Sequence, residues 1–132
     1  MTRDDVFDYI KKEYLTEPEY LWKSFPDYAV MRHVGNRKWF AVIMNVKRGR
    51  LGMDEEDAYI DIIVVKCDPA YADELLRRDG FRPGYHMNQR NWVTVLFDNT
   101  VADGEITELI DASFILTQIR DTGKIVVYDT YS

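Results

Sequence analysis

The sequence predicts an α+β fold, in which helices pack on one face of an antiparallel sheet. Runs rich in β-branched and aromatic residues recur between residues 28 and 98, and the first two flank a Gly-Asn pair typical of a hairpin turn. Stretches with apolar residues at helical spacing stand at 4–14, 68–80 and 102–119. The predicted order is therefore helix, three strands, helix, strand, helix.

The first helix is expected over residues 4–14. Asp4 and Asp5 open this stretch and Lys11 and Lys12 stand near its end, an order of charges that suits the helix dipole. Pro18 prevents a simple continuation of the helix. The following residues are expected to form a connection anchored by the aromatic side chains of Tyr20, Trp22 and Phe25.

A hairpin is predicted from the strands 28–34 and 37–46. Gly35 and Asn36 are suited to a two-residue turn. That turn would place three cross-strand pairs opposite each other: Arg32 with Trp39, Met31 with Phe40, and His33 with Lys38.

The rest of the chain supplies two strands and two helices. A polar link is followed by a strand over 58–67, and Asp68 and Pro69 then form a capped helix start. Gly80 suits the end of that helix. Residues 81–91 are expected to be a loop, and the remaining expected elements are a strand over 92–98, a helix over 102–119 and a short strand in the tail at 123–132.

Length and composition favour one domain over residues 1–132. No apolar run approaches the ~20 residues of a membrane span. The N-terminal stretch is charged and amphipathic, unlike a secretory signal. We therefore expect a cytoplasmic, monomeric protein without membrane contact. The single cysteine, Cys67, ends an apolar run and is expected to be a buried hydrophobic residue.

Charge is distributed unevenly along the chain, although its net value is −6. Residues 28–53 and 80–97 contain no acid and together carry +8, whereas the other 9 basic and 23 acidic residues sum to −14. A fold that joins these two acid-free stretches would create one positive face on an acidic protein.

Several segments resemble the MmcQ/YjbR family. They are "RKWFAVI", "VVKCDP", "RPGYHMNQRNWVTVLFD" and "ITELIDASFIL", and the resemblance covers about residues 5–118, leaving 119–132 as a C-terminal tail. "PGYHMNQRNW" is its most specific part, although Asn91 stands where the family often has histidine. The resemblance implies a CyaY-like fold, similar to bacterial frataxin, and a DNA-binding protein with a double-wing arrangement.

Weak nucleic-acid binding is the function this resemblance and the charge pattern favour. A basic hairpin could neutralise phosphates, with Trp39 as a stacking platform, and the loop "GYHMNQRNW" holds residue types that contact phosphates and base edges. The candidate residues are Arg32, Arg37, Lys38, Trp39, Lys47, Arg48, Arg50, Arg82, His86, Asn88, Gln89 and Arg90. The competing interpretation is structural: His86 and Asn88 bond to backbone and shape the turn.

The residues bear on three other functions. Catalysis is not expected, because the chain has two histidines, one cysteine and no recognisable catalytic, cofactor or zinc motif. Weak metal binding by acidic residues would follow the frataxin-like fold, with Asp4, Asp5, Asp8 and Glu13, or the cluster 54–57, as candidates. A protein-interaction module would use the aromatic connection around Tyr20, Trp22 and Phe25.

Overall fold

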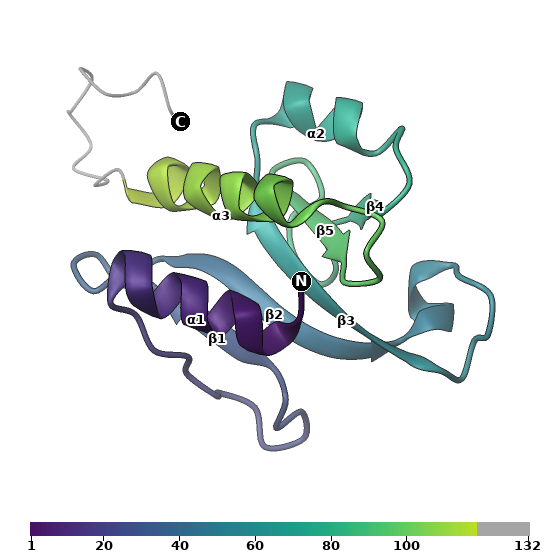
Figure 1. Ribbon diagram of the computed structural model, residues 1–132, viewed down its shortest axis with the longest axis horizontal. Coiled ribbons are helices and arrows are strands. Elements are labelled where there is room, and N and C mark those ends of the chain that lie inside the picture. Colours follow the sequence, from purple (N-terminus) through teal and green to yellow (C-terminus); the bar gives the residue numbers. More distant parts are fainter. Residues whose placement is uncertain (119–132) are drawn as a thin grey trace.

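Residues 1–118, which the computed structural model describes, form a five-stranded antiparallel sheet with helices on one face (Figure 1). The strand order is β1-β2-β3-β5-β4. The elements are α1 (Arg3–Tyr14), β1 (Ala29–Arg32), β2 (Trp39–Lys47), the 3-10 turn η1 (Arg48–Leu51), β3 (Tyr59–Lys66), α2 (Pro69–Leu75), β4 (Phe81–Pro83), β5 (Trp92–Leu96) and α3 (Asp103–Gln118). The predicted α+β class is confirmed. The strand expected at 123–132 lies outside the described residues.

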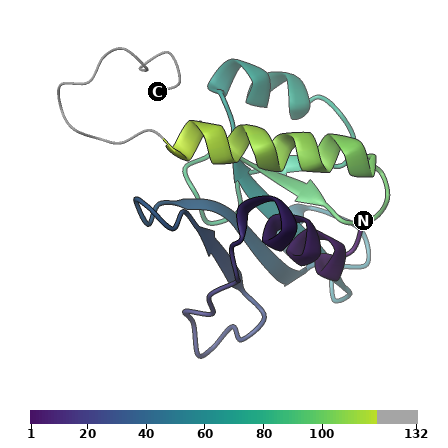
Figure 2. The ribbon, with the colours of Figure 1, turned by 60° about the vertical axis from the view of Figure 1, so that its left-hand side comes forward.

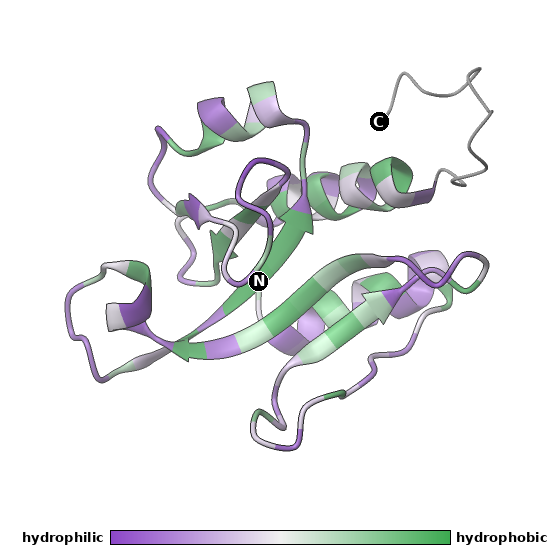
Figure 3. Ribbon diagram, turned by 180° about the vertical axis from the view of Figure 1, so that it is seen from behind, coloured by the Kyte–Doolittle hydropathy of each residue, from purple (hydrophilic) through white to green (hydrophobic). Residues whose placement is uncertain are grey.

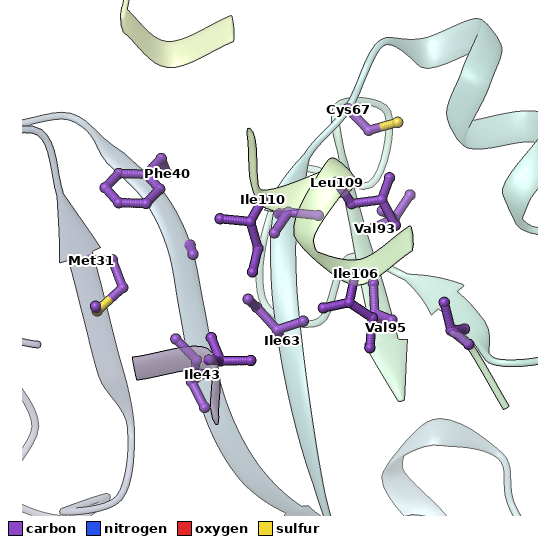
Figure 4. Packing of buried hydrophobic residues seen from close by; sticks show 14 of the residues in the cluster. Met31, Phe40, Ile43, Ile63, Cys67, Val93, Val95, Ile106, Leu109 and Ile110 are labelled. Atoms are coloured by element: carbon purple, nitrogen blue, oxygen red, sulfur yellow. The ribbon is translucent and has the colours of Figure 1, made fainter. Parts of the chain in front are cut away.

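Helices α1 and α3 lie side by side on one face of the sheet (Figures 1 and 2). The core beneath them is apolar, and Val6 and Ile10 of α1 are fully buried in it. Ile106 and Ile110 of α3 are almost fully buried against the strands (Figure 4). Helix α2 adds Ala72 and Leu75 to the same cluster, and Cys67 is buried there as expected. Burial of this apolar surface is the main stabilising term for the fold.

The predicted starts of the first two helices are confirmed, α1 within one residue, by their caps. Thr2 and Asp5 form a reciprocal capping box at α1, and the Asp68 side chain accepts the Ala70 N–H at α2. Helix α2 is shorter than the predicted 68–80. It ends at Leu75, and turns follow as far as Gly80.

The hairpin between β1 and β2 has a longer turn than predicted. Arg32 does pair with Trp39, and the His33 N–H donates to Lys38 O. The turn itself comprises four residues, 34–37, because the Asn36 side chain accepts the Lys38 N–H and donates to Thr117 O at the end of α3. This places the turn against α3, with Arg37 in the left-handed region at φ 63°.

A bulge at Phe40 overturns the predicted pairing of Met31 with Phe40. Met31 pairs instead with Ala41, so the register shifts by one residue between Met31 and Arg32. The shift places both Phe40 and Ala41 in the cluster under the helices. Ser113 of α3 fills the irregularity, since its hydroxyl donates to Phe40 O at 2.6 Å and accepts the Lys66 N–H at 2.9 Å.

One strand was not predicted. β4 occupies Phe81–Pro83, inside the stretch expected to be a loop, and pairs antiparallel with β5 at the sheet edge. Its proline suits an edge position, because an edge strand leaves some N–H groups without a ladder partner.

Candidate functional site

The sheet face opposite α1 and α3, here called the open face, is covered by loops rather than helices (Figure 3). Alternate strand residues form a second apolar cluster on it, including Val42, Met44, Ile62 and Val64. Aromatic side chains pack over this cluster: Trp22, Tyr28 and Tyr85 from the loops, and Trp39 from the first position of β2. All three tryptophans of the chain lie here, because Trp92 is part of the same cluster.

Two adjoining hollows lie between these loops and β2; together we call them the aromatic cleft. The apolar hollow, about 250 Å³, is lined by Trp22, Trp39, Met44 and Met87. The polar hollow, about 320 Å³, is lined by Asp27, Asn45, Lys47, Arg50 and Tyr59. Phe25, Tyr28, Tyr85 and His86 border both hollows.

The loop at residues 84–91 is held over the sheet by β5. The Thr94 hydroxyl donates to Pro83 O and accepts the Tyr85 N–H, both at 2.9 Å. Gly84 is required by close packing, because a Cβ there would lie 2.7 Å from the Trp92 carbonyl oxygen. These contacts hold Tyr85 and His86 at the cleft.

Asn88 and His86 have different roles in this loop. The Asn88 side chain accepts the Arg90 N–H and its carbonyl accepts the N–H groups of Asn91 and Trp92, so Asn88 shapes the turn. His86 has a positive φ of 59°, and its ring lies 4.1 Å from that of Tyr85. Within residues 1–118 the His86 side chain makes no hydrogen bond, so it borders the cleft with its ring nitrogens available.

The two acid-free stretches do meet on the open face. Residues 28–53 supply the floor and one wall of the cleft, and residues 84–87 supply another wall. Residues 22–27, which lie outside both stretches and include Asp27, line the remaining side. Arg82 joins the stretches directly, since its Nε donates to Leu51 O at 3.0 Å. Arg82 also donates to Phe81 O, so its guanidinium is engaged in structure.

Most cations of the hairpin hypothesis are already paired. Glu19 contacts Arg32 at 3.4 Å and Arg37 at 2.9 Å, and Arg32 also lies over the Trp39 ring. Arg48 donates to Asp54 O, and Lys47 lies 4.0 Å from an Asp57 oxygen. Among residues 1–118, the side chains of Arg50, Gln89 and Arg90 make no hydrogen bond or ion pair.

These cations also lie at two separate ends of β2. Trp39 and Lys47 are eight residues apart in an extended strand, which is about 26 Å at ~3.3 Å per residue. The hairpin thus groups Arg32, Arg37 and Lys38 at one end, and Lys47, Arg48 and Arg50 at the other. The cleft runs along β2 between them.

Sequence reasoning missed the contribution of Tyr28, Tyr59 and Tyr85 to the cleft. Tyr28 is half-buried, and burial raises its pKa, with the neighbouring Tyr85 phenol adding to the rise. It therefore stays a neutral hydrogen-bonding group at ordinary pH. The signal for it was present: β2 alternates Val42, Met44 and Val46 on the face opposite the helices, which indicates that loops must cover that face.

Cys67 and His33, the other residues with potentially reactive side chains, are both buried in the packed interior. Burial raises the pKa of the Cys67 thiol to about 11, so it stays protonated and unreactive at neutral pH. His33 is buried, and its Nε2 lies 2.7 Å from the Thr117 hydroxyl, which itself donates to Ser113 O. Because that hydroxyl has one hydrogen, it must accept from His33, which fixes the Nε2–H tautomer.

Within the described residues, no group of three or more His, Cys, Asp or Glu side chains converges as a metal site would require. Neither acidic stretch considered above, at the start of α1 or at 54–57, forms such a group. No helix in residues 1–118 combines the length and the apolar character needed to cross a membrane.

The fold and its open face define an α+β protein with a helix-covered side and a loop-covered side. The YjbR family model matches residues 12–116, and the chain belongs to the YjbR family. YyaQ of Bacillus subtilis, described only as an uncharacterized protein, is 42% identical over 118 residues, covering 89% of this chain and 99% of YyaQ.

Solved structures show the same architecture. A crystal structure of a Pseudomonas syringae protein matches with a TM-score of 0.86 and 40% identity, covering 89% of this chain and 99% of that one. A Deinococcus radiodurans protein matches at 21% identity with a TM-score of 0.69, covering 98% of this chain and 86% of that one, and shares the fold.

Proposed function

We propose that this protein is a non-catalytic nucleic-acid-binding module and that it binds through the aromatic cleft. One observation carries the proposal: the two acid-free stretches meet on the open face around a cluster of aromatic rings, with Lys47, Arg50 and His86 at the border. Aromatic faces that stack on bases, beside cations that contact phosphates, are the usual means of binding nucleic acid without sequence readout.

The non-catalytic assignment is supported by the surroundings of the reactive groups. A nucleophile needs a nearby base and an orienting partner. Cys67 and His33 are buried in packing contacts, and His86 has no hydrogen-bonded partner among residues 1–118. The cleft offers stacking and hydrogen bonding but no assembled catalytic pair.

Because most of the hairpin cations are already paired, we assign the proposed binding surface to the cleft rather than to the hairpin. Because Glu19 contacts both Arg32 and Arg37, a phosphate there would have to compete with a carboxylate. Arg50 has no such competitor in the described chain, and Lys47 has only a long contact with the fully exposed Asp57 side chain. Exposed pairs of that kind contribute little, so Lys47 is readily recruited by a ligand.

An amide chemical-shift titration with a short oligonucleotide at low salt tests the proposal. Shifts should concentrate in residues 22–28, 39–50 and 84–87. The double variant Lys47→Glu, Arg50→Glu should lose binding, whereas Lys12→Glu on α1, a charge reversal on the opposite side of the molecule, should keep it. Binding that is unchanged in the double variant would contradict the assignment to the cleft.

A protein-interaction module is the second candidate. It is favoured by large apolar side chains exposed on the loop before β1: Tyr20 is 54%, Leu21 44% and Phe25 50% exposed. Pull-down from lysate with and without nuclease separates the two functions. A partner that survives nuclease and is lost in Leu21→Ser supports protein docking, and a partner lost with nuclease supports nucleic acid.

A further inference from the structure

We propose that the aromatic cleft takes one unpaired nucleotide, with its base in the apolar hollow and its phosphate in the polar hollow. The protein would then prefer single-stranded to duplex nucleic acid. This inference rests on the proposed nucleic-acid-binding function and specifies the ligand of the same site.

The apolar hollow has the walls that a base requires. Trp22 meets Trp39 nearly perpendicularly, with ring centroids 5.8 Å apart and an interplanar angle of 88°. Phe25 stacks on Tyr28 with centroids at 4.7 Å and an angle of 14°. Met44 and Met87 supply adaptable apolar contacts. A planar ring entering this hollow can therefore meet aromatic faces and edges at once.

The polar hollow adjoins the apolar hollow, so it can receive the phosphate of a nucleotide whose base lies in the apolar hollow. Phe25, Tyr28, Tyr85 and His86 border both hollows, so a ligand can occupy the two without leaving the cleft. Arg50 and Lys47 stand at the polar hollow, and Arg50 makes no ion pair within residues 1–118. A cation that makes no hydrogen bond or ion pair of its own is available to bond to an incoming phosphate.

The shape of the cleft selects against a duplex. Proteins read a duplex by placing a protruding helix or ribbon in its groove. Here the aromatic rings line a hollow, and bases inside a duplex cannot reach it without leaving their stack. The β1–β2 hairpin, the ribbon that could otherwise contact a groove, carries Arg32 and Arg37 in ion pairs with Glu19.

Removal of the negative charge of Asp27 tests the inference in the opposite direction to removal of the positive charge of Arg50. Asp27 lines the polar hollow with Lys47 and Arg50, and its backbone carbonyl accepts a hydrogen bond from Arg3. A phosphate in that hollow is repelled by the Asp27 carboxylate. Asp27→Asn should therefore tighten nucleotide binding, whereas Arg50→Gln should weaken it.

Quenching of tryptophan fluorescence is the direct experiment, because all three tryptophans lie on the open face. The probes are a 12-nucleotide oligothymidylate, a mixed-sequence 12-base-pair duplex, and a 12-mer of abasic sugar-phosphate. We expect the oligothymidylate to bind at least about fivefold tighter than either other probe, since one base–aromatic stack contributes about 1–3 kcal/mol, or about 5- to 150-fold.

Variants locate the effect. Phe25→Ala should weaken oligothymidylate binding by about 5-fold or more, and since Phe25 is 50% exposed its loss should leave folding intact. Tyr71→Ala on α2, an aromatic truncation at 42% exposure away from the open face, is the matched control and should bind normally. A thermal melt of each variant verifies the fold.

The possible outcomes distinguish this inference from the proposed nucleic-acid-binding function on which it rests. Duplex binding that equals or exceeds single-strand binding overturns the single-nucleotide inference and leaves nucleic-acid binding in place. Equal binding of the abasic and thymidylate strands overturns the base subsite alone. Absence of binding to all three probes overturns both proposals.

Discussion

Single residues at the cleft are held by packing as much as by hydrogen bonds. Thr94, fully buried in β5, holds the loop through two bonds, and Gly84 permits the loop to pass directly over Trp92. Arg50 and His86, which line the cleft, make no such bonds within residues 1–118. Positioning and binding are thus assigned to different side chains of the same few segments.

Gly84→Ala should destabilise the protein, because a Cβ at this position would lie 2.7 Å from a backbone oxygen that cannot move independently. Overpacking of this kind typically costs about 1–3 kcal/mol. Urea denaturation measures the change. Gly35→Ala is the control: no atom lies within 4 Å of its added Cβ, and a similar loss there would show that close packing is not the cause.

His33 should make stability depend on pH. Burial lowers its pKa, with Lys38 adding to the effect, so the folded protein holds this proton less tightly than the unfolded chain. The contribution is therefore fully present above the ordinary histidine pKa of 6.5 and is lost as the pH falls below it. One proton limits the slope to about 1.4 kcal/mol per pH unit.

Urea denaturation between pH 7.5 and 5.5 measures this slope. His33→Gln should reduce this slope. His86→Gln, which replaces an exposed histidine, should leave the His33 contribution to the slope unchanged. A His33→Gln variant with an unchanged slope would show that this buried ring does not set the pH dependence.

At the scale of elements, α1 and α3 are joined by a clamp of two phenols on one carboxylate. Tyr9 and Tyr14 of α1 both donate to Asp111 of α3, at 2.7 and 2.5 Å to the same oxygen. Tyr14 also stacks on Phe114, with centroids 3.9 Å apart. Burial, together with bonding to Asp111, raises the pKa of both tyrosines, so the phenols remain protonated donors.

Asp111→Ala should cost at least about 2 kcal/mol, because a single hydrogen bond to a charged group contributes ~1.5–3 kcal/mol and two phenols lose their acceptor. A double-mutant cycle with Tyr14→Phe isolates the pair. A coupling energy near zero would assign the loss to repacking. Asp73→Ala on the exposed surface of α2 is the control and should change stability little.

Most helices and strands could be predicted from the sequence. Helical periodicity, caps and β-rich runs predicted every helix and four of the five strands within residues 1–118, since these signals are local. The bulge at Phe40 and the four-residue turn depend on Ser113 and Asn36 meeting the sheet and α3, contacts about 70 to 80 residues apart in the chain. β4 has only three residues, too few for a periodic pattern.

The candidate site was predicted in part for the same reason. The acid-free stretches indicated a shared face, and they do meet there. Pairing of Arg32 and Arg37 with Glu19 was hidden, because Glu19 reaches them through a backbone bridge to Val30. The aromatic cleft itself needs three segments to converge, which no local pattern encodes.

At the scale of the whole molecule, few cations face the proposed ligand in a protein of net charge −6. If Lys47 and Arg50 neutralise two phosphates of a single strand, log K should fall with log[salt] at a slope of about −1.4, at ~0.7 per phosphate. Binding would then weaken only about sevenfold between about 50 and 200 mM salt. The acidic remainder repels the strand most at low salt and flattens the slope further.

Use of all eight cations of the two acid-free stretches on a duplex would instead give a slope of about −7, at ~0.9 per phosphate. Fluorescence titrations at four salt concentrations distinguish these values. Arg50→Gln should make the shallow slope shallower by about 0.7, and Arg37→Gln, whose partner is Glu19, should leave it unchanged. A wild-type slope steeper than about −4 would mean that the hairpin cations leave their carboxylates to bind phosphates, and the ribbon rather than the cleft would then be the main binding surface.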